Sequence, residues 1–302
     1  MTSDLMAFDL PAYLHAHRAR IDDALDAFVP PVAKHPPRLH EAMRYSLFCG
    51  GKRLRPILAI AAAEALGQPA HTVLPLACAL ECIHTFSLIH DDLPALDNDD
   101  LRRGSPTSHV VFGEAMAILA GDALLALAFE LVVECRLFWP DARVLDALAM
   151  LARASGTPGM VGGQVSDMEG EGRHDMTEAD IASIHTRKTG ALLVASLLGS
   201  ARLCGATVAQ ERALRTYGDC LGLAFQITDD ILDLEGEAHV IGKPVGSDLV
   251  QDKATYPKIL GLEASRRLAA QSSHDAVQAL ALFDYHADPL RALARYVTER
   301  QH

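Results

Sequence analysis

Two aspartate clusters have a spacing that suits metal binding better than surface solvation. In the second cluster, Asp229 and Asp233 lie four residues apart in an otherwise apolar segment, with no basic residue within four positions. On a helix both carboxylates leave the same face, where like charges repel each other. Magnesium is held by a few carboxylates together with substrate phosphates. The pair therefore predicts a magnesium site for a phosphorylated substrate.

The first cluster begins at Asp91 and reaches Asp97 six residues later. A continuous helix would point these two side chains about 120° apart. Pro94 disfavours helix at the residue before it, so we expect the helix to end near residue 93 and the chain to turn back, which brings Asp97 towards Asp91. One cluster alone fits a solvated helix end, but two clusters that each end an apolar helical segment favour a functional site.

Basic residues near these clusters match the charge of a diphosphate. The segment 50–56 reads Gly-Gly-Lys-Arg-Leu-Arg-Pro, a flexible loop with three cations and a proline suited to the first turn of a helix. A helix N-terminus with adjacent cations attracts phosphate. His84 precedes Asp91 by two helical turns and shares its face. The alternatives are a solvated basic turn for the loop, a core position for His84, and salt bridges from Arg102 and Arg103 to the neighbouring acids.

Helices must position these residues, because strand patterns are almost absent. Apolar residues recur at three- and four-residue spacing in Ala- and Leu-rich stretches, and the segment 190–200 is apolar on all sides, which is typical of the inside of a large bundle. The pattern predicts an all-α fold with one domain over residues 1–302. The expected helices cover 38–49, 56–67, 71–93, 112–138, 141–155, 177–204, 207–235, 255–282 and 286–300.

Composition narrows the function classes. The 302 residues include 27 Lys and Arg against 39 Asp and Glu, a net charge of −12, which argues against nucleic-acid binding. None of the six cysteines forms a C-x-x-C pair, so a zinc cluster is not expected and a reduced, cytoplasmic setting fits. We see no signal peptide. The apolar stretch 115–133 is interrupted by Gly121, Asp122 and Glu130, so no membrane span is expected.

The motifs together resemble the trans-isoprenyl diphosphate synthases, most closely the bacterial farnesyl diphosphate synthases. They occur in the family's order over residues 38–262: the segment 50–56, the first aspartate cluster running into 101–104, Gly163-Gln164 with Asp167, Lys188-Thr189-Gly190, and 225–233. The resemblance implies an all-α bundle around a central cavity, usually a homodimer, with the two aspartate clusters facing each other.

The resemblance also implies a ligand for each carboxylate. Asp91 and Asp97 would bind magnesium on one wall and Asp229 on the other, with Asp92 and Asp233 in support. Three ions would grip the diphosphate of the allylic substrate, and manganese is an alternative metal.

The cations divide between two substrates in the same way. By resemblance, the catalytic contacts to the allylic diphosphate come from Lys188, Thr189, Gln226 and Lys243, with Arg102 beside them. Isopentenyl diphosphate would be held by Lys52, Arg55, His84 and Arg103. Lys253 is a further expected substrate-binding residue. The stretch 236–253, which carries Lys243 and Lys253, is either a segment that closes over the site or an ordinary surface loop.

Product length depends on cavity depth within this family. Phe86 and Ser87, five and four residues before Asp91, would form the floor, and an aromatic ring there resembles enzymes with fifteen-carbon products. We therefore expect farnesyl diphosphate from dimethylallyl and geranyl diphosphate. The alternatives are a geranyl or geranylgeranyl diphosphate synthase, a class I terpene cyclase, and a non-catalytic synthase subunit.

Overall fold

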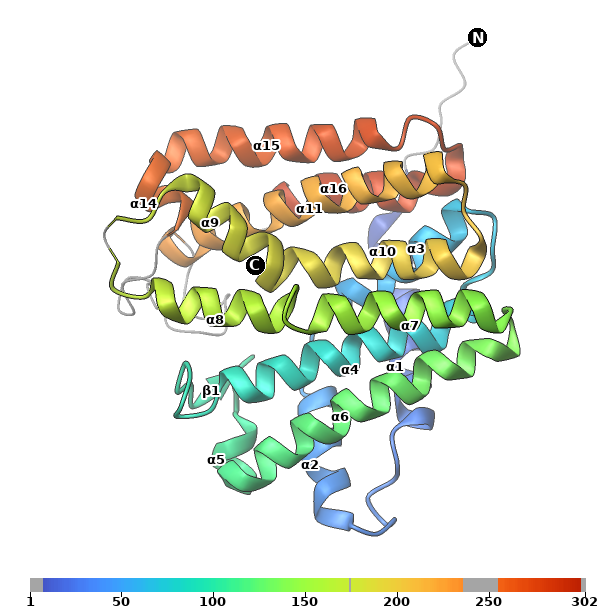
Figure 1. The fold of residues 1–302 in the computed structure, drawn as a ribbon, viewed down its shortest axis with the longest axis vertical. Helices are drawn as coiled ribbons and strands as arrows, with labels where there is room; N and C mark the ends of the chain where they lie inside the picture. Colours follow the sequence, from blue (N-terminus) through green and yellow to red (C-terminus); the bar gives the residue numbers. More distant parts are fainter. Residues whose placement is uncertain (1–7, 174, 236–254, 300–302) are drawn as a thin grey trace.

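The computed structural model describes residues 8–173, 175–235 and 255–299, and these residues form helices with one short hairpin (Figure 1). The first part of the chain forms α1 (Leu10–Phe28), α2 (Pro37–Phe48), α3 (Leu54–Ala65), α4 (Leu74–Asp91), α5 (Ser108–Phe112) and α6 (Glu114–Glu134). The second part forms α7 (Asp141–Ser155), α8 (Met160–Gly170), α9 (Glu178–His185), α10 (Ala191–Cys204), α11 (Val208–Glu235), α14 (Tyr256–Leu260), α15 (Leu262–Ala279) and α16 (Asp288–Glu299). The all-α prediction is confirmed.

Short elements connect these helices. A π-helical turn, η3 (Thr186–Gly190), joins α9 to α10, and 3-10 turns are present at η1 (Ala70–Val73), η2 (Cys135–Leu137) and η4 (Tyr285–Ala287). Strand β1 (Leu101–Arg102) pairs antiparallel with β2 (Ser105–Pro106) just after the first aspartate cluster. The hairpin therefore follows directly from the cluster that we expected to bind metal.

Most predicted helices are present, but some are divided. The expected segment 255–282 is divided at Gly261 into α14 and α15. The expected segment 177–204 is split by η3, although its start is as predicted, since Thr177 and Asp180 form a reciprocal N-terminal cap. Helices α1 and α8 were not predicted. Helix α8 contains the adjacent glycines Gly162 and Gly163, which lower intrinsic helix propensity, so its helix depends on packing against its neighbours.

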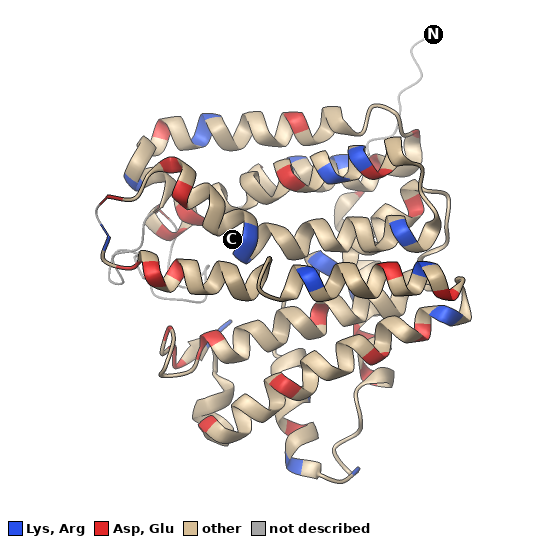
Figure 2. Ribbon diagram, viewed as in Figure 1, with Lys and Arg blue, Asp and Glu red and all other residues tan. Residues whose placement is uncertain are grey.

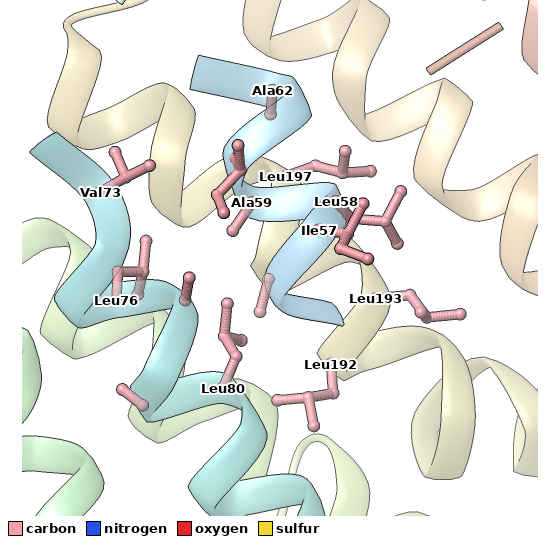
Figure 3. Packing of buried hydrophobic residues seen from close by; sticks show 14 of the residues in the cluster. Ile57, Leu58, Ala59, Ala62, Val73, Leu76, Leu80, Leu192, Leu193 and Leu197 are labelled. Atoms are coloured by element: carbon pink, nitrogen blue, oxygen red, sulfur yellow. The ribbon is translucent and has the colours of Figure 1, made fainter. Parts of the chain in front are cut away.

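The centre of the bundle is built from α3, α4 and α10, which are apolar on nearly all sides. Figure 3 shows Ile57 and Leu58 of α3, Leu80 of α4 and Leu193 of α10 packed together. These four side chains have at most a trace of exposure. Four alanines in α3, at positions 59 and 61–63, are fully buried and let the neighbouring helices approach closely. This rigid centre carries the C-terminal end of α4, where Asp91 lies.

Helix α6 packs against α4 on one side and leaves apolar residues exposed on the other. The segments 70–91 and 114–137 are both long and apolar enough to cross a membrane by length and composition alone. In the most apolar 18-residue window of segment 70–91, 78% is buried inside the protein. In the corresponding window of segment 114–137, only 39% is buried. Burial in the core thus explains why α4 is apolar, whereas it does not explain the apolar residues on the exposed face of α6.

Candidate active site

The first aspartate cluster turns back on itself as predicted. Helix α4 ends at Asp91, and the backbone N–H of Asp97 donates to the carbonyl of Asp91 at 2.8 Å. The N–H of Asn98 closes the turn on the carbonyl of Leu93 at 3.1 Å. Acidic residues gather at this end of the bundle, near β1, α8 and α9 (Figure 2). The turn therefore brings the two ends of the cluster together.

A cavity of about 350 Å³ lies beside this turn, between α4, α8 and η3. It brings together residues from four separate segments of the sequence. Seven of the predicted site residues line it: Arg55, His84, Phe86, Ser87, Asp91, Lys188 and Thr189. A larger cavity of about 520 Å³, between α7, α10 and α11, contains none of the predicted residues. We therefore assign the chemistry to the smaller cavity.

Asp91 carries an unfavourable charge in the absence of a cation. Burial, together with nearby Asp97, raises its pKa from 3.8 to about 6, and Lys188 only partly offsets this. A carboxylate in this position gains from a cation bound next to it, which is what the sequence pattern predicts. The electrostatics thus fit a metal ligand at Asp91.

Lys188 is held over the cavity by Asp167. Its Nζ donates to the Asp167 carboxylate at 2.6 Å. Burial lowers the pKa of Lys188, but Asp167 and Asp91 outweigh that effect and raise it above its ordinary value. Gly163 of α8 makes this arrangement feasible, because a Cβ there would lie 2.3 Å from the Lys188 backbone nitrogen. The π-helical turn thus presents a charged ammonium group to the site.

A chain of hydrogen bonds links η3 to the second aspartate cluster. The Thr189 hydroxyl donates to Gln226 Oε1 at 2.9 Å, and Gln226 Nε2 donates to Asp230 Oδ1 at 2.9 Å. The other oxygen of Asp230 accepts from the Tyr256 backbone N–H at 3.0 Å. Asp230 is buried at 3% exposure. It is therefore a structural residue, which leaves Asp229 and Asp233, both half-buried, as the predicted metal ligands.

Of the cations at the start of α3, Arg53 points into the core and Arg55 lines the cavity. Arg53 turns inward and donates to Glu81 at 2.9 Å and to Asp22 at 2.8 Å. Arg55 instead lines the cavity, and its buried Nε has no hydrogen-bond partner in the described part of the chain. Burial lowers the pKa of Arg55 to about 10, against the opposing effects of Glu81 and Asp229. The charge of Asp229 acts on Arg55, although the residues of the second cluster are not among those that line the cavity.

The remaining predicted anion ligands occupy three different settings. His84 lines the cavity, and burial together with the positive charge of Arg55 lowers its pKa well below the ordinary value, which favours its neutral form. Arg103 donates to the carbonyl of Gly50 and thereby joins the loop before α3. Lys52 is exposed in that loop.

Arg102 forms a salt bridge with acids of the first aspartate cluster, which was the alternative to a substrate contact in the sequence analysis. Its guanidinium contacts Asp92 at 2.5 Å and Asp99 at 3.3 Å. Asp92 is buried. The metal-supporting role of Asp92 and the substrate contact of Arg102 stay predictions, and the structure shows the two side chains in contact with each other. Lys243 and Lys253, with the stretch 236–253, lie outside the described residues.

The carboxylates fit magnesium only in partnership with a substrate. Among the residues that the structure describes, no three His, Cys, Asp or Glu side chains come close enough to hold an ion by themselves. Magnesium keeps several waters and is bound by one or two carboxylates plus substrate phosphates, so such an incomplete set suits it. Asp91 and Asp97, which the turn holds together, could supply one or two such carboxylates, and Asp229 stays a predicted ligand.

Sequence reasoning missed the far wall of the cavity. This wall is an apolar face of α8, a helix that was not predicted, and the Gly163-Gln164 motif was the signal that pointed to it. Its lining residues are Met160, Val161, Gln164, Val165 and Met168.

Comparison with known proteins identifies the family. Residues 36–280 match the family model described as Polyprenyl synthetase. The chain belongs to the polyprenyl synthetase family. A chloroplastic geranylgeranyl pyrophosphate synthase of Capsicum annuum is 46% identical over 97% of this chain and 79% of its own length. Membership makes the protein a prenyltransferase that elongates isoprenoid chains.

Two solved structures resemble this polyprenyl synthetase over nearly its whole length. The apo FPP/GFPP synthase of Zymomonas mobilis is 38% identical, with a TM-score of 0.87 over 97% of this chain and 100% of that one. A polyprenyl synthase of Caulobacter crescentus, solved with calcium and isoprenyl diphosphate, is 31% identical, with a TM-score of 0.86 over 97% of each chain. That second complex agrees with a divalent metal and an isoprenyl diphosphate as ligands of the family.

Proposed function

We propose that this polyprenyl synthetase condenses isopentenyl diphosphate with allylic diphosphates and that its main product is geranylgeranyl diphosphate. The observation that carries the twenty-carbon assignment is the 46% identity to the geranylgeranyl pyrophosphate synthase of Capsicum annuum. This favours the alternative over the farnesyl product expected from the sequence. Chain-length analysis of the products made from dimethylallyl and isopentenyl diphosphate tests it. A main product shorter than twenty carbons would contradict the assignment.

Different residues would bind the diphosphate that leaves and the diphosphate that stays attached. Asp91, Asp97 and Asp229 would hold magnesium, which when bound stabilises the charge that develops on a leaving diphosphate. Lys188, fixed by Asp167, supplies a further positive charge on the same side. Arg55 lies beside His84 on the cavity wall and anchors the diphosphate that stays attached, since a guanidinium suits bidentate phosphate contact.

The condensation then needs no protein nucleophile. The allylic C–O bond breaks, the double bond of isopentenyl diphosphate attacks the allylic cation, and the new C–C bond is followed by loss of a proton. Among the described residues that line the cavity we assign no dedicated base, so the released diphosphate would take the proton. The apolar wall of α8 excludes water, which would otherwise trap the cation.

Farnesyl diphosphate is a second candidate product because Phe86 lines the cavity. The ring is only 7% exposed and lies one and a half turns before Asp91 on α4. We expect Phe86→Ala to add at least one five-carbon unit to the main product, because it removes the ring from the path of the growing chain. Mass analysis of dephosphorylated products measures this. A product distribution equal to that of the wild type would remove Phe86 from the floor.

We also propose that the protein forms a homodimer through α6. Leu119 and Val133 on this helix are 54% and 39% exposed, and Leu145 of α7 is 63% exposed. Large apolar side chains exposed on neighbouring helices would be covered if a second copy of the chain packed against them. Sedimentation equilibrium should give about twice the chain mass of 32.5 kDa, and Leu119→Arg should give the monomer mass. A wild-type chain that sediments as a monomer would contradict the proposal.

A further inference from the structure

His90 lies between the cavity and α6, in contact with both. It is a lining residue of the cavity, next to Asp91 at the end of α4. Its Nε2 lies 3.1 Å from the carbonyl oxygen of Ile118 on α6. Because a carbonyl only accepts, Nε2 must carry the proton and donate. The imidazole is therefore fixed to the backbone of a neighbouring helix, and Figure 1 shows α4 and α6 side by side.

Gly121 provides the space for that ring. A Cβ at position 121 would lie 2.3 Å from His90 Nε2 and 2.6 Å from Cδ2, which is closer than real atoms approach. Glycine also weakens a helix interior, and Gly121 is in the middle of α6. The close approach of His90 gives a physical reason for a glycine here.

His90 also supports Phe86. The two rings meet edge to face, with centroids 5.0 Å apart and an interplanar angle of 83°. The residues are four positions apart on α4, so they stack one turn above the other. Phe86 and His90 both line the cavity. The ring of His90 thus lies between α6 and the proposed floor.

We propose that His90 and Gly121 set the length of the product together with Phe86. His90 positions the Phe86 ring and closes part of the floor itself, and Gly121 determines how far from the cavity the imidazole lies. This inference rests on the proposed prenyl elongation and adds a second helix, α6, to the residues that control chain length.

The two residues predict shifts of opposite sign. Gly121→Ala pushes the imidazole away from α6 and into the cavity, so the product becomes shorter. His90→Ala empties that space and releases the Phe86 ring, so the product becomes longer. We expect each change to shift the ratio of the longest product to the next shorter one by roughly tenfold, which is the discrimination that a one-carbon change in an apolar pocket gives.

The test measures product chain lengths of wild type, Gly121→Ala, His90→Ala and the double variant. In the double variant no imidazole remains to be displaced, so Gly121→Ala should no longer shorten the product. Gly199→Ala is the matched control, because it adds a methyl group to another buried helical glycine that meets only the flexible side chain of Leu76, at 3.1 Å. Its product distribution should equal that of the wild type.

Calorimetric binding of geranyl and geranylgeranyl diphosphate gives a readout that does not need turnover. Gly121→Ala should weaken binding of the twenty-carbon ligand roughly tenfold and leave the ten-carbon ligand unchanged. Wild-type condensation with unaltered lengths and affinities in both single variants would overturn this inference alone. Absence of condensation by the wild type would instead overturn the proposed function. If Gly121→Ala does not fold, His90→Ala still has to lengthen the product.

Discussion

Replacing Asp91 with asparagine is expected to lower kcat by about 10³-fold, as a loss of about 4 kcal/mol of transition-state stabilisation requires. Asp91 is the cluster residue that lines the cavity, and its charge is the one that burial disfavours most clearly. Single-turnover kinetics with saturating substrates measure the effect. Asp100→Asn is the control: this exposed residue lies in the same cluster, outside the cavity lining, and should keep activity within about twofold.

The same substitution should stabilise the metal-free protein. Because the folded-state pKa of Asp91 is raised from 3.8 to about 6, its ionised form costs stability at neutral pH, and this cost disappears as the pH falls through 6 towards 4. Asp91→Asn should therefore raise the melting temperature at pH 7.5 in a chelator, with the difference shrinking below pH 6. A lower melting temperature at pH 7.5 would contradict the assigned electrostatics.

The second large effect is expected at Arg55. Arg55→Ala should lower kcat/KM for isopentenyl diphosphate roughly 100-fold, because a charge-assisted hydrogen bond to phosphate is lost from a site that otherwise leaves Arg55 Nε without a partner. The KM for the allylic substrate should change by no more than about twofold, since we propose that the aspartate clusters bind that substrate.

Two variants sharpen the assignment of Arg55. Arg55→Lys should recover only part of the loss, because an ammonium group cannot make the bidentate contact. Arg136→Ala removes an exposed arginine outside the cavity lining and should leave both constants unchanged. Equal effects of Arg55→Ala on both substrates would contradict the division between the two diphosphates.

The sequence predicted the site where local chemistry determines local structure. Pro94 was enough to place the end of α4 and the return of Asp97 to Asp91, and Thr177 marked the start of α9. It did not predict α8, because a helix with two adjacent glycines depends on tertiary packing, which a local pattern does not contain.

Pairings between distant residues were equally hard to predict. From the sequence alone, Arg102 could contact either an acid of its own cluster or a substrate. The fold shows that it contacts Asp92. The contact of Gly121 with His90 crosses two helices and leaves no mark in the spacing of either. Charges near a site are thus visible in the sequence, whereas the contacts that orient them are not.

The most direct test of the central claim is metal-dependent consumption of isopentenyl diphosphate. Purified protein is incubated with dimethylallyl and isopentenyl diphosphate in a chelator, and then with excess magnesium, while the prenyl products are measured. The account predicts no product in the chelator, rapid elongation after magnesium is added, and a twenty-carbon main product. Elongation at the same rate in the chelator, or none from folded protein with magnesium, would contradict the account.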